Sequence, residues 1–256
     1  MCLLLIAINS NPNYKLIIAA NRDEFYGRPT MPAHFWNDYP SILAGKDIQA
    51  GGTWLGITKT GRISAITNIR KGLKQKDNAP TRGLLTADYL RNNIDPLDYL
   101  KIVKQIASNY NGFNLILGDT ENFYYFSNMQ GSIEKLENGI YGLSNGFLDS
   151  DWPKVVESKI KLENVIKANN FSPEELFNIL NDRSIAEDNL LPNTGVDLEI
   201  ERILSAVFIK TEKYGTRCST VITIYKDDKV NFVERTFNNV NDNITETAYN
   251  FIIGER

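Results

Sequence analysis

Two apolar runs separated by a short polar turn open the sequence. The first, Cys2-Leu-Leu-Leu-Ile-Ala-Ile8, is followed by the polar residues 9–13 and then by Tyr14-Lys-Leu-Ile-Ile-Ala-Ala20. Apolar runs on both sides of asparagine and proline predict a β-hairpin, and the lack of alternation predicts strands buried on both faces. In an antiparallel hairpin the start of the first strand lies beside the end of the second. We therefore expect Cys2 to lie near the polar string Asn21-Arg-Asp-Glu24.

The rest of the chain predicts strands and helices in blocks. Asp95-Pro96 places an N-cap and a first-turn proline before a helical apolar face, and Ser172-Pro-Glu-Glu175 has the pattern of a capping box. Further helices are expected over 81–90 and from Pro153 onward, and further strands over 51–57, 61–68, 113–117, 123–126, 141–143, 206–209, 219–225 and 230–235. Such blocks favour an α+β architecture with antiparallel pairing. Because no linker or repeat interrupts them, we expect a single domain over residues 1–256.

Composition and charge exclude several classes of function. The 28 basic and 31 acidic residues give a net charge of −3, without a basic run that favours nucleic-acid binding. The two cysteines form no Cys-x-x-Cys pair, which indicates a reducing compartment, and with His34 as the single histidine a multi-histidine metal site is excluded. The first apolar run ends at Asn9, too short to span a bilayer. We expect a cytoplasmic protein without transmembrane segment, metal or cofactor, whose oligomeric state stays open.

Cys2 carries the candidate chemistry because it directly follows Met1. If Met1 is removed, the thiol and the free α-amine lie on one residue, with ordinary pKa values of about 8.5 and roughly 7.7 to 8.0. The amine then accepts the thiol proton near neutral pH, which is the arrangement of an N-terminal nucleophile. The alternative is a buried structural cysteine, and position alone favours that role.

Such a nucleophile needs supporting groups, and the sequence offers one for each role. The Asp23 carboxylate is suited to hold the amine, and the side-chain amides of Asn68 and Asn145 are suited to donate to an oxyanion. Arg22 or Arg217 can lower the pKa of the thiol. Taken singly, such residues are more often ion-paired loop, turn or cap residues.

Five segments together resemble the motifs of one family. They are residues 20–25, which contain the Asn-Arg-Asp-Glu string, 50–56, 67–70, 143–145 with 152–155, and 214–220. In this order they are similar to the motifs of the NRDE family, the family of the transport and Golgi organization 2 protein, over nearly the whole chain. That family is similar to the N-terminal-nucleophile (Ntn) hydrolases. The resemblance therefore implies a four-layer αββα sandwich of two stacked antiparallel sheets.

The resemblance also implies a set of site residues. The related cholylglycine hydrolase and penicillin V acylase group works with a cysteine, an arginine and an aspartate soon after it, two asparagines and a distal arginine. The positions of this chain that match that set are Cys2, Arg22, Asp23, Asn68, Asn145 and Arg217. The first hypothesis is thus a hydrolase in which Cys2 attacks a linear amide or related acyl bond of a small molecule.

The alternative hypothesis is a non-catalytic carrier of a hydrophobic ligand such as haem or a lipid. It follows from the resemblance, since animal members of the family are associated with Golgi organisation and mitochondrial lipid metabolism, and a role in moving haem has been proposed for them. The residues available as axial haem ligands are Cys2, Cys218, His34, the three methionines and the tyrosines.

Overall fold

The computed structural model describes residues 2–70, 75–168, 170–238 and 243–254, with Cys2 described by its backbone alone. The strands are β1 (Cys2–Asn11), β2 (Tyr14–Phe25), β3 (Thr30–Phe35), β4 (Ile42–Asp47), β5 (Leu55–Thr58), β6 (Ile63–Asn68), β7 (Phe113–Gly118), β8 (Phe123–Ser127), β9 (Ile133–Leu136), β10 (Gly139–Leu143), β11 (Tyr214–Tyr225), β12 (Lys229–Phe237) and β13 (Ile244–Ile252). The α-helices are α1 (Gly83–Arg91), α2 (Pro96–Ile106), α3 (Pro153–Lys167), α4 (Pro173–Leu180) and α5 (Leu198–Ser205). Two short 3-10 helices are η1 (Ala107–Asn109) and η2 (Asp188–Leu190).

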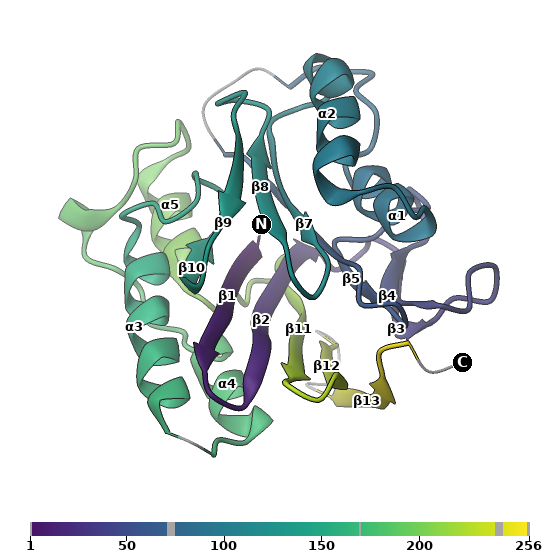
Figure 1. The fold of residues 1–256 in the computed structure, drawn as a ribbon. Coiled ribbons are helices and arrows are strands. Elements are labelled where there is room, and N and C mark those ends of the chain that lie inside the picture. Colours follow the sequence, from purple (N-terminus) through teal and green to yellow (C-terminus); the bar gives the residue numbers. More distant parts are fainter. Residues whose placement is uncertain (1, 71–74, 169, 239–242, 255–256) are drawn as a thin grey trace. The chain divides into compact units, whose positions relative to one another are not determined.

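The strands form two sheets, and the contacts within the chain divide it into two units (Figure 1). The first unit comprises residues 1–27, 70–73 and 138–250 and is built on a six-stranded sheet of order β10-β1-β2-β11-β12-β13. The second comprises residues 28–69, 74–137 and 251–256 and is built on a seven-stranded sheet of order β3-β4-β5-β6-β7-β8-β9. The expectation of a single domain over residues 1–256 stays a prediction.

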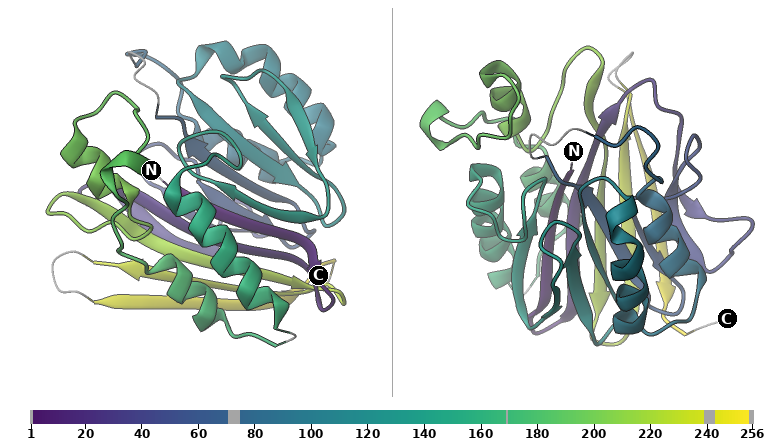
Figure 2. Two further views of the ribbon diagram at one scale, coloured as in Figure 1. Left: turned by 90° about the vertical axis from the view of Figure 1, so that its left-hand side faces the viewer. Right: turned by 90° about the horizontal axis from the view of Figure 1, so that it is seen from above.

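In the first unit, α3 and α4 cover one face of the six-stranded sheet (Figures 1 and 2). Leu162 of α3 and Leu180 of α4 belong to the same buried cluster as Leu5 of β1 and Ile17 of β2. Each large aliphatic side chain buried in this way contributes roughly 1.5–3 kcal/mol. Since β1 is paired on both sides, the strand that begins at Cys2 is an interior strand of the sheet.

In the second unit, α1 and α2 pack on the seven-stranded sheet. Tyr89 of α1 and Leu100 of α2 share a buried cluster with Phe113 and Phe126, whose ring centroids lie 5.9 Å apart. Among the described residues the longest helix, α3, has 15 residues, and none combines the length and hydrophobicity that a membrane crossing requires.

Local capping signals mark the helix starts where the sequence predicted them. The Asp95 carboxylate accepts the backbone N–H groups of Leu97 and Asp98 at the start of α2. At α4, Ser172 and Glu175 form the expected capping box. Each cap satisfies backbone donors that otherwise have no partner within the helix.

The strand expected over residues 206–209 is wrong. The segment is buried, but its N–H groups donate elsewhere: Phe208 to the carbonyl of Asp182, and Ile209 to the hydroxyl of Thr216. Those bonds satisfy the backbone without a ladder, so an apolar run becomes an irregular buried segment. The second strand of the hairpin, in contrast, is longer than expected, because β2 continues through the Asn-Arg-Asp-Glu string to Phe25.

Candidate functional site

Cys2 lies at one end of an interior strand, with Arg22 directly across from it. The β1–β2 register pairs Cys2 with Arg22, and the β2–β11 register pairs Arg22 with Cys218. On the next rung, Asp23 is opposite Thr216. The hairpin therefore brings Cys2 beside the Asn-Arg-Asp-Glu string as expected, and β11 adds residues from the far end of the sequence.

Asn145 lies on the side of β1 opposite to β2, two residues after the end of β10. The β1–β10 ladder pairs Leu4 with Leu143, so two further residues along each strand lead to Cys2 and Asn145. Asn145 is 1% exposed, and its backbone carbonyl accepts the N–H of Arg70 at 2.8 Å. These residues lie on four neighbouring strands or at their ends, and we call them the strand-end row. The row consists of Asn145, Cys2, Arg22, Asp23, Arg217 and Cys218.

Asp23 is the buried acid of the strand-end row. It is 3% exposed, and its Oδ1 accepts the hydroxyl of Thr216 at 2.7 Å. Burial raises the pKa of Asp23, against the opposing effects of the Lys154 ammonium, the Thr216 hydrogen bond and the Arg22 guanidinium. A desolvated carboxylate of this kind gains most from an ammonium placed next to it.

Lys154 is a buried cation that the sequence reasoning did not single out. It stands in the first turn of α3 at 5% exposure, and its Nζ donates to the carbonyls of Leu204 at 2.8 Å and Ala206 at 3.3 Å. It thus holds the segment after α5 while its charge stabilises ionised Asp23. The available signal was its place in the 152–155 motif, directly after the proline that starts a helix.

Two arginines belong to the row. Arg22 is 5% exposed, with its Nη2 3.9 Å from Oε2 of Glu24. Arg217 lies at a bulge in β11, and its Nη1 donates to the carbonyls of Phe25 at 2.9 Å and Tyr26 at 3.1 Å. Burial lowers the pKa of Arg217, and the positive charge of Arg22 lowers it further. The positive charges of Arg22 and Arg217 thus oppose each other, and the charge of Glu24 offsets part of that repulsion.

The remaining predicted donor, Asn68, is in the second unit. It is the last residue of β6, is paired with Phe113 in the ladder, and is exposed. It is therefore not part of the strand-end row, and its role as an oxyanion donor stays a prediction.

Asn21, the first residue of the Asn-Arg-Asp-Glu string, has a structural role. Its Nδ2 donates to the carbonyls of Leu180 at 2.8 Å and Val207 at 2.9 Å, and its Oδ1 accepts the hydroxyl of Ser219 at 2.5 Å. One buried amide thus joins β2 to the end of α4, to the segment after α5 and to β11. The string holds a structural residue and a buried acid on one strand.

Cys218 and His34, two of the candidate haem ligands, do not belong to a metal-binding cluster of the described residues. Cys218 is a core residue at 4% exposure, and His34 has its Nδ1 2.8 Å from the carbonyl of Pro32 in the second unit. Over the described ranges, no three His, Cys, Asp or Glu side chains gather as a metal site requires.

Comparison with known sequences decides the family. A family model described as Transport and Golgi organisation 2 matches residues 1–239. The chain belongs to this family. It is 36% identical over 257 residues to the human Transport and Golgi organization protein 2 homolog, and 34% identical over 260 residues to the mouse homolog, covering 92% of both chains in each case. The family expected from the motifs is confirmed.

Solved structures show the fold class of the Transport and Golgi organisation 2 chain. A Caenorhabditis elegans N-acylethanolamine-hydrolyzing acid amidase ortholog matches with a TM-score of 0.52 at 12% identity, over 86% of this chain and 92% of that one. A variant of the conjugated bile acid hydrolase from Clostridium perfringens matches with a TM-score of 0.52 at 11% identity, over 98% of both chains. The predicted α+β sandwich of two antiparallel sheets, as in Ntn hydrolases, is confirmed.

Proposed function

We propose that this protein is an N-terminal-cysteine hydrolase that cleaves a linear amide or related acyl bond of a small molecule. The observation that carries the proposal is the strand-end row, in which Cys2 is opposite Arg22 and one rung from the buried Asp23. Structural neighbours named as an amidase and as a conjugated bile acid hydrolase support an amide or acyl bond as the target.

In the first half of the reaction Cys2 is acylated. Removal of Met1 leaves Cys2 with a free amine, which takes the proton of the thiol as the sulfur attacks the acyl carbon. The carbonyl oxygen becomes an oxyanion, for which we assign the side-chain amide of Asn145 as a donor. The C–N bond then breaks, the amine of Cys2 passes its proton to the leaving nitrogen, and a thioester remains.

In the second half water releases the acid. The amine of Cys2 takes a proton from a water molecule, and the resulting hydroxide attacks the thioester carbon. The C–S bond breaks and the sulfur recovers the proton from the amine, so Cys2 returns to its starting state with one water consumed.

The charged residues of the strand-end row have separate tasks in this scheme. Asp23 holds the ammonium form of the Cys2 amine, and Thr216 holds Asp23. Arg22 and Arg217 lower the pKa of the thiol or bind a carboxylate of the substrate. Because the mechanism needs a reduced thiol, we keep the cytoplasm as the proposed compartment.

The first test is the state of residue 1, since the mechanism requires loss of Met1. We expect the intact mass of the native protein to lack one methionine. A Cys218→Ala background then leaves Cys2 as the sole thiol of the chain. In that background we expect alkylation at neutral pH to be faster than in urea-unfolded protein, and Arg22→Ala to slow it.

The second test is catalysis. On a panel of N-acyl amides we expect wild type and Cys218→Ala to be active and Cys2→Ala to be inactive with an unchanged far-UV spectrum. Retained Met1, or Cys2→Ala with full activity, would contradict nucleophilic catalysis by Cys2. A stoichiometric Soret shift on haem titration of an inactive protein favours the carrier instead.

A further inference from the structure

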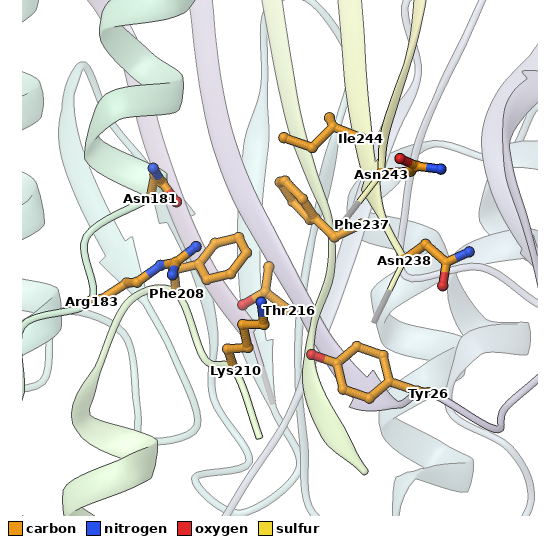
Figure 3. Close-up of a pocket in the computed structure, with 10 residues that line it drawn as sticks. All are labelled: Tyr26, Asn181, Arg183, Phe208, Lys210, Thr216, Phe237, Asn238, Asn243 and Ile244. Carbon is orange, nitrogen blue, oxygen red and sulfur yellow. The ribbon is translucent and has the colours of Figure 1, made fainter. Parts of the chain in front are cut away.

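A cavity of about 240 Å³ opens in the first unit (Figure 3). Its aromatic and cationic lining comes from four places in the sequence: Tyr26 after β2, Arg183 after α4, Phe208 and Lys210 after α5, and Phe237 at the end of β12. Asn181, Thr216, Asn238, Asn243 and Ile244 complete the described lining. The cavity is therefore built by the fold of the unit and not by a single loop.

One wall of the cavity is aromatic. The rings of Phe208 and Phe237 meet edge to face, with centroids 4.8 Å apart and planes at 85°. Phe208 is 5% exposed, so this wall is a fixed part of the core, and Ile244 adds an exposed apolar side chain beside it. A flat apolar ring gains both buried area and aromatic contact on such a surface.

The charged lining of the cavity is cationic. Arg183 and Lys210 contribute positive charges, and no described lining residue carries a carboxylate. The guanidinium of Arg183 lies over the ring of Phe208, 4.9 Å from its centroid, which places a fork of N–H donors at the edge of the aromatic wall. The lining thus favours a ligand that carries a negative charge next to an apolar ring.

Asp182, which directly precedes Arg183 in the sequence, is paired with Lys161. Burial raises the pKa of Asp182, but the hydrogen bonds from Lys161 and Ser184 outweigh it and bring the pKa to about 2. The Asp182 carboxylate is therefore committed to its own ammonium partner, Lys161.

We propose that this cavity binds a small aromatic carboxylate. The ring lies against Phe208 and Phe237, and the carboxylate accepts hydrogen bonds from Arg183 and Lys210, a geometry that the planar guanidinium fork favours. The volume equals that of about eight water molecules, which limits the ligand to one or two rings. This site goes beyond the proposed hydrolase, since none of its cationic or aromatic residues takes part in the acylation scheme.

The cavity also reaches the strand-end row through one hydroxyl. Thr216 lines the cavity, accepts the N–H of Ile209 at 2.9 Å and donates to Oδ1 of Asp23 at 2.7 Å. A ligand that contacts Thr216 is thus one hydrogen bond away from Asp23.

The test is calorimetric titration of 2-naphthoate into the Cys2→Ala protein, in which turnover cannot disturb the measurement. The neutral isostere 2-naphthamide tests the charge, and Arg183→Gln and Lys210→Gln test the cations. Lys101→Gln is the matched control, because Lys101 is an exposed lysine of α2 in the second unit. We expect 2-naphthoate to bind with 1:1 stoichiometry. We also expect a loss of at least about tenfold in affinity for 2-naphthamide, Arg183→Gln and Lys210→Gln, and no change for Lys101→Gln.

Three outcomes overturn the proposal. The first is the absence of 2-naphthoate binding at millimolar concentration to protein whose melting temperature is that of wild type. The second is equal affinity for 2-naphthoate and 2-naphthamide, which leaves only apolar adsorption. The third is an equal effect of Arg183→Gln and Lys101→Gln, which indicates attraction to net charge alone. Because binding is read without turnover, failure of this proposal is distinguishable from failure of the proposed hydrolase.

Discussion

The hydroxyl of Thr216 donates to Oδ1 of Asp23 at 2.7 Å and at the same time accepts the N–H of Ile209 at 2.9 Å. One side chain therefore connects the buried acid of the strand-end row with the irregular segment that runs from 206 to 209. Both groups that it serves are buried, so water cannot replace the hydroxyl at low cost.

Thr216→Val is expected to destabilise the protein by about 1–3 kcal/mol, because it leaves a buried N–H and a buried carboxylate oxygen without this partner. Thr216→Ser keeps the hydroxyl and should retain most of the stability. Urea unfolding of the three proteins measures the difference. Equal midpoints for the valine and serine variants would show that the hydroxyl does not contribute to stability.

Asp23→Asn is expected to unfold at or above the melting temperature of wild type at pH 7, although it removes an acid of the strand-end row. Burial raises the pKa of Asp23 above its ordinary value of 3.8, so the native state binds the proton more tightly than the unfolded chain. That contribution to stability is fully present below pH 3.8 and is lost as the pH rises through the folded-state pKa. At pH 7, where the unfolded chain carries this carboxyl ionised, that contribution is no longer present in full, so a neutral amide at this position is expected to stabilise the protein.

Scanning calorimetry as a function of pH checks this prediction, since a gain of about 1 kcal/mol raises Tm by roughly 2–4 °C in a chain of this size. The gain over wild type should shrink as the pH falls and vanish below 3.8, where the carboxyl becomes protonated in both states. Glu24→Gln, on the same strand but partly exposed, is the control. A Tm for Asp23→Asn several degrees below that of wild type at pH 7 would refute the argument.

Asn21→Ala is expected to cost about 3 kcal/mol or more, because it leaves the carbonyls of Leu180 and Val207 and the hydroxyl of Ser219 without the buried amide. Asn92→Ala is the matched control, since its Nδ2 also donates to a carbonyl, that of Asp88 at 2.8 Å, but at an exposed position. The control should cost under about 1 kcal/mol. Chemical denaturation that gives the same loss for both variants contradicts the structural role of Asn21.

Arg70 and the buried Glu201 form a largely buried ion pair, with Nη2 of Arg70 2.8 Å from Oε2 of Glu201. Glu201 also accepts the backbone N–H and the hydroxyl of Thr194. Arg70→Met alone or Glu201→Gln alone is expected to destabilise by about 3–5 kcal/mol, since each leaves one buried group uncompensated. The double variant should cost clearly less than the sum.

A double-mutant cycle with guanidinium chloride unfolding measures this coupling. The exposed pair Lys101 and Asp98, at 2.7 Å, is the comparison and should show a coupling below about 1 kcal/mol. Additive effects of Arg70→Met and Glu201→Gln would rule out a favourable pair.

The parts of the fold that the sequence predicts are those with local signals. The first hairpin follows from two apolar runs around a turn, and the starts of α2 and α4 follow from their caps. Helix α5 was missed because it does not bury its apolar residues and expose its polar ones, as an amphipathic helix does. It buries Glu201 and leaves Ile200 and Ile203 about two-fifths exposed. Strands β3, β4, β9 and β13 were also missed, and β9 and β13 mix polar and apolar residues at largely exposed positions.

The same holds for the candidate site: its local contacts could be predicted from the sequence, and its long-range contacts could not. Hairpin geometry alone brings Cys2 to Arg22, but the place of Arg217 depends on a ladder between β2 and β11 that no local pattern encodes. Lys154 and Thr216 were missed because their importance comes from what they contact, the carbonyls after α5 and the Asp23 carboxylate. No spacing in the sequence reveals such contacts.

The order of strands in the first sheet also fixes when it can form during synthesis. The hairpin of β1 and β2 is complete by Phe25. However, β1 can pair with β10, and β2 with β11, only after those later strands have been synthesised. Until then a nascent chain carries two open apolar edges, which are templates for pairing with the wrong partner. Since long-range pairing slows folding, a chain stalled before Tyr225 on the ribosome is expected to need a chaperone on this hairpin.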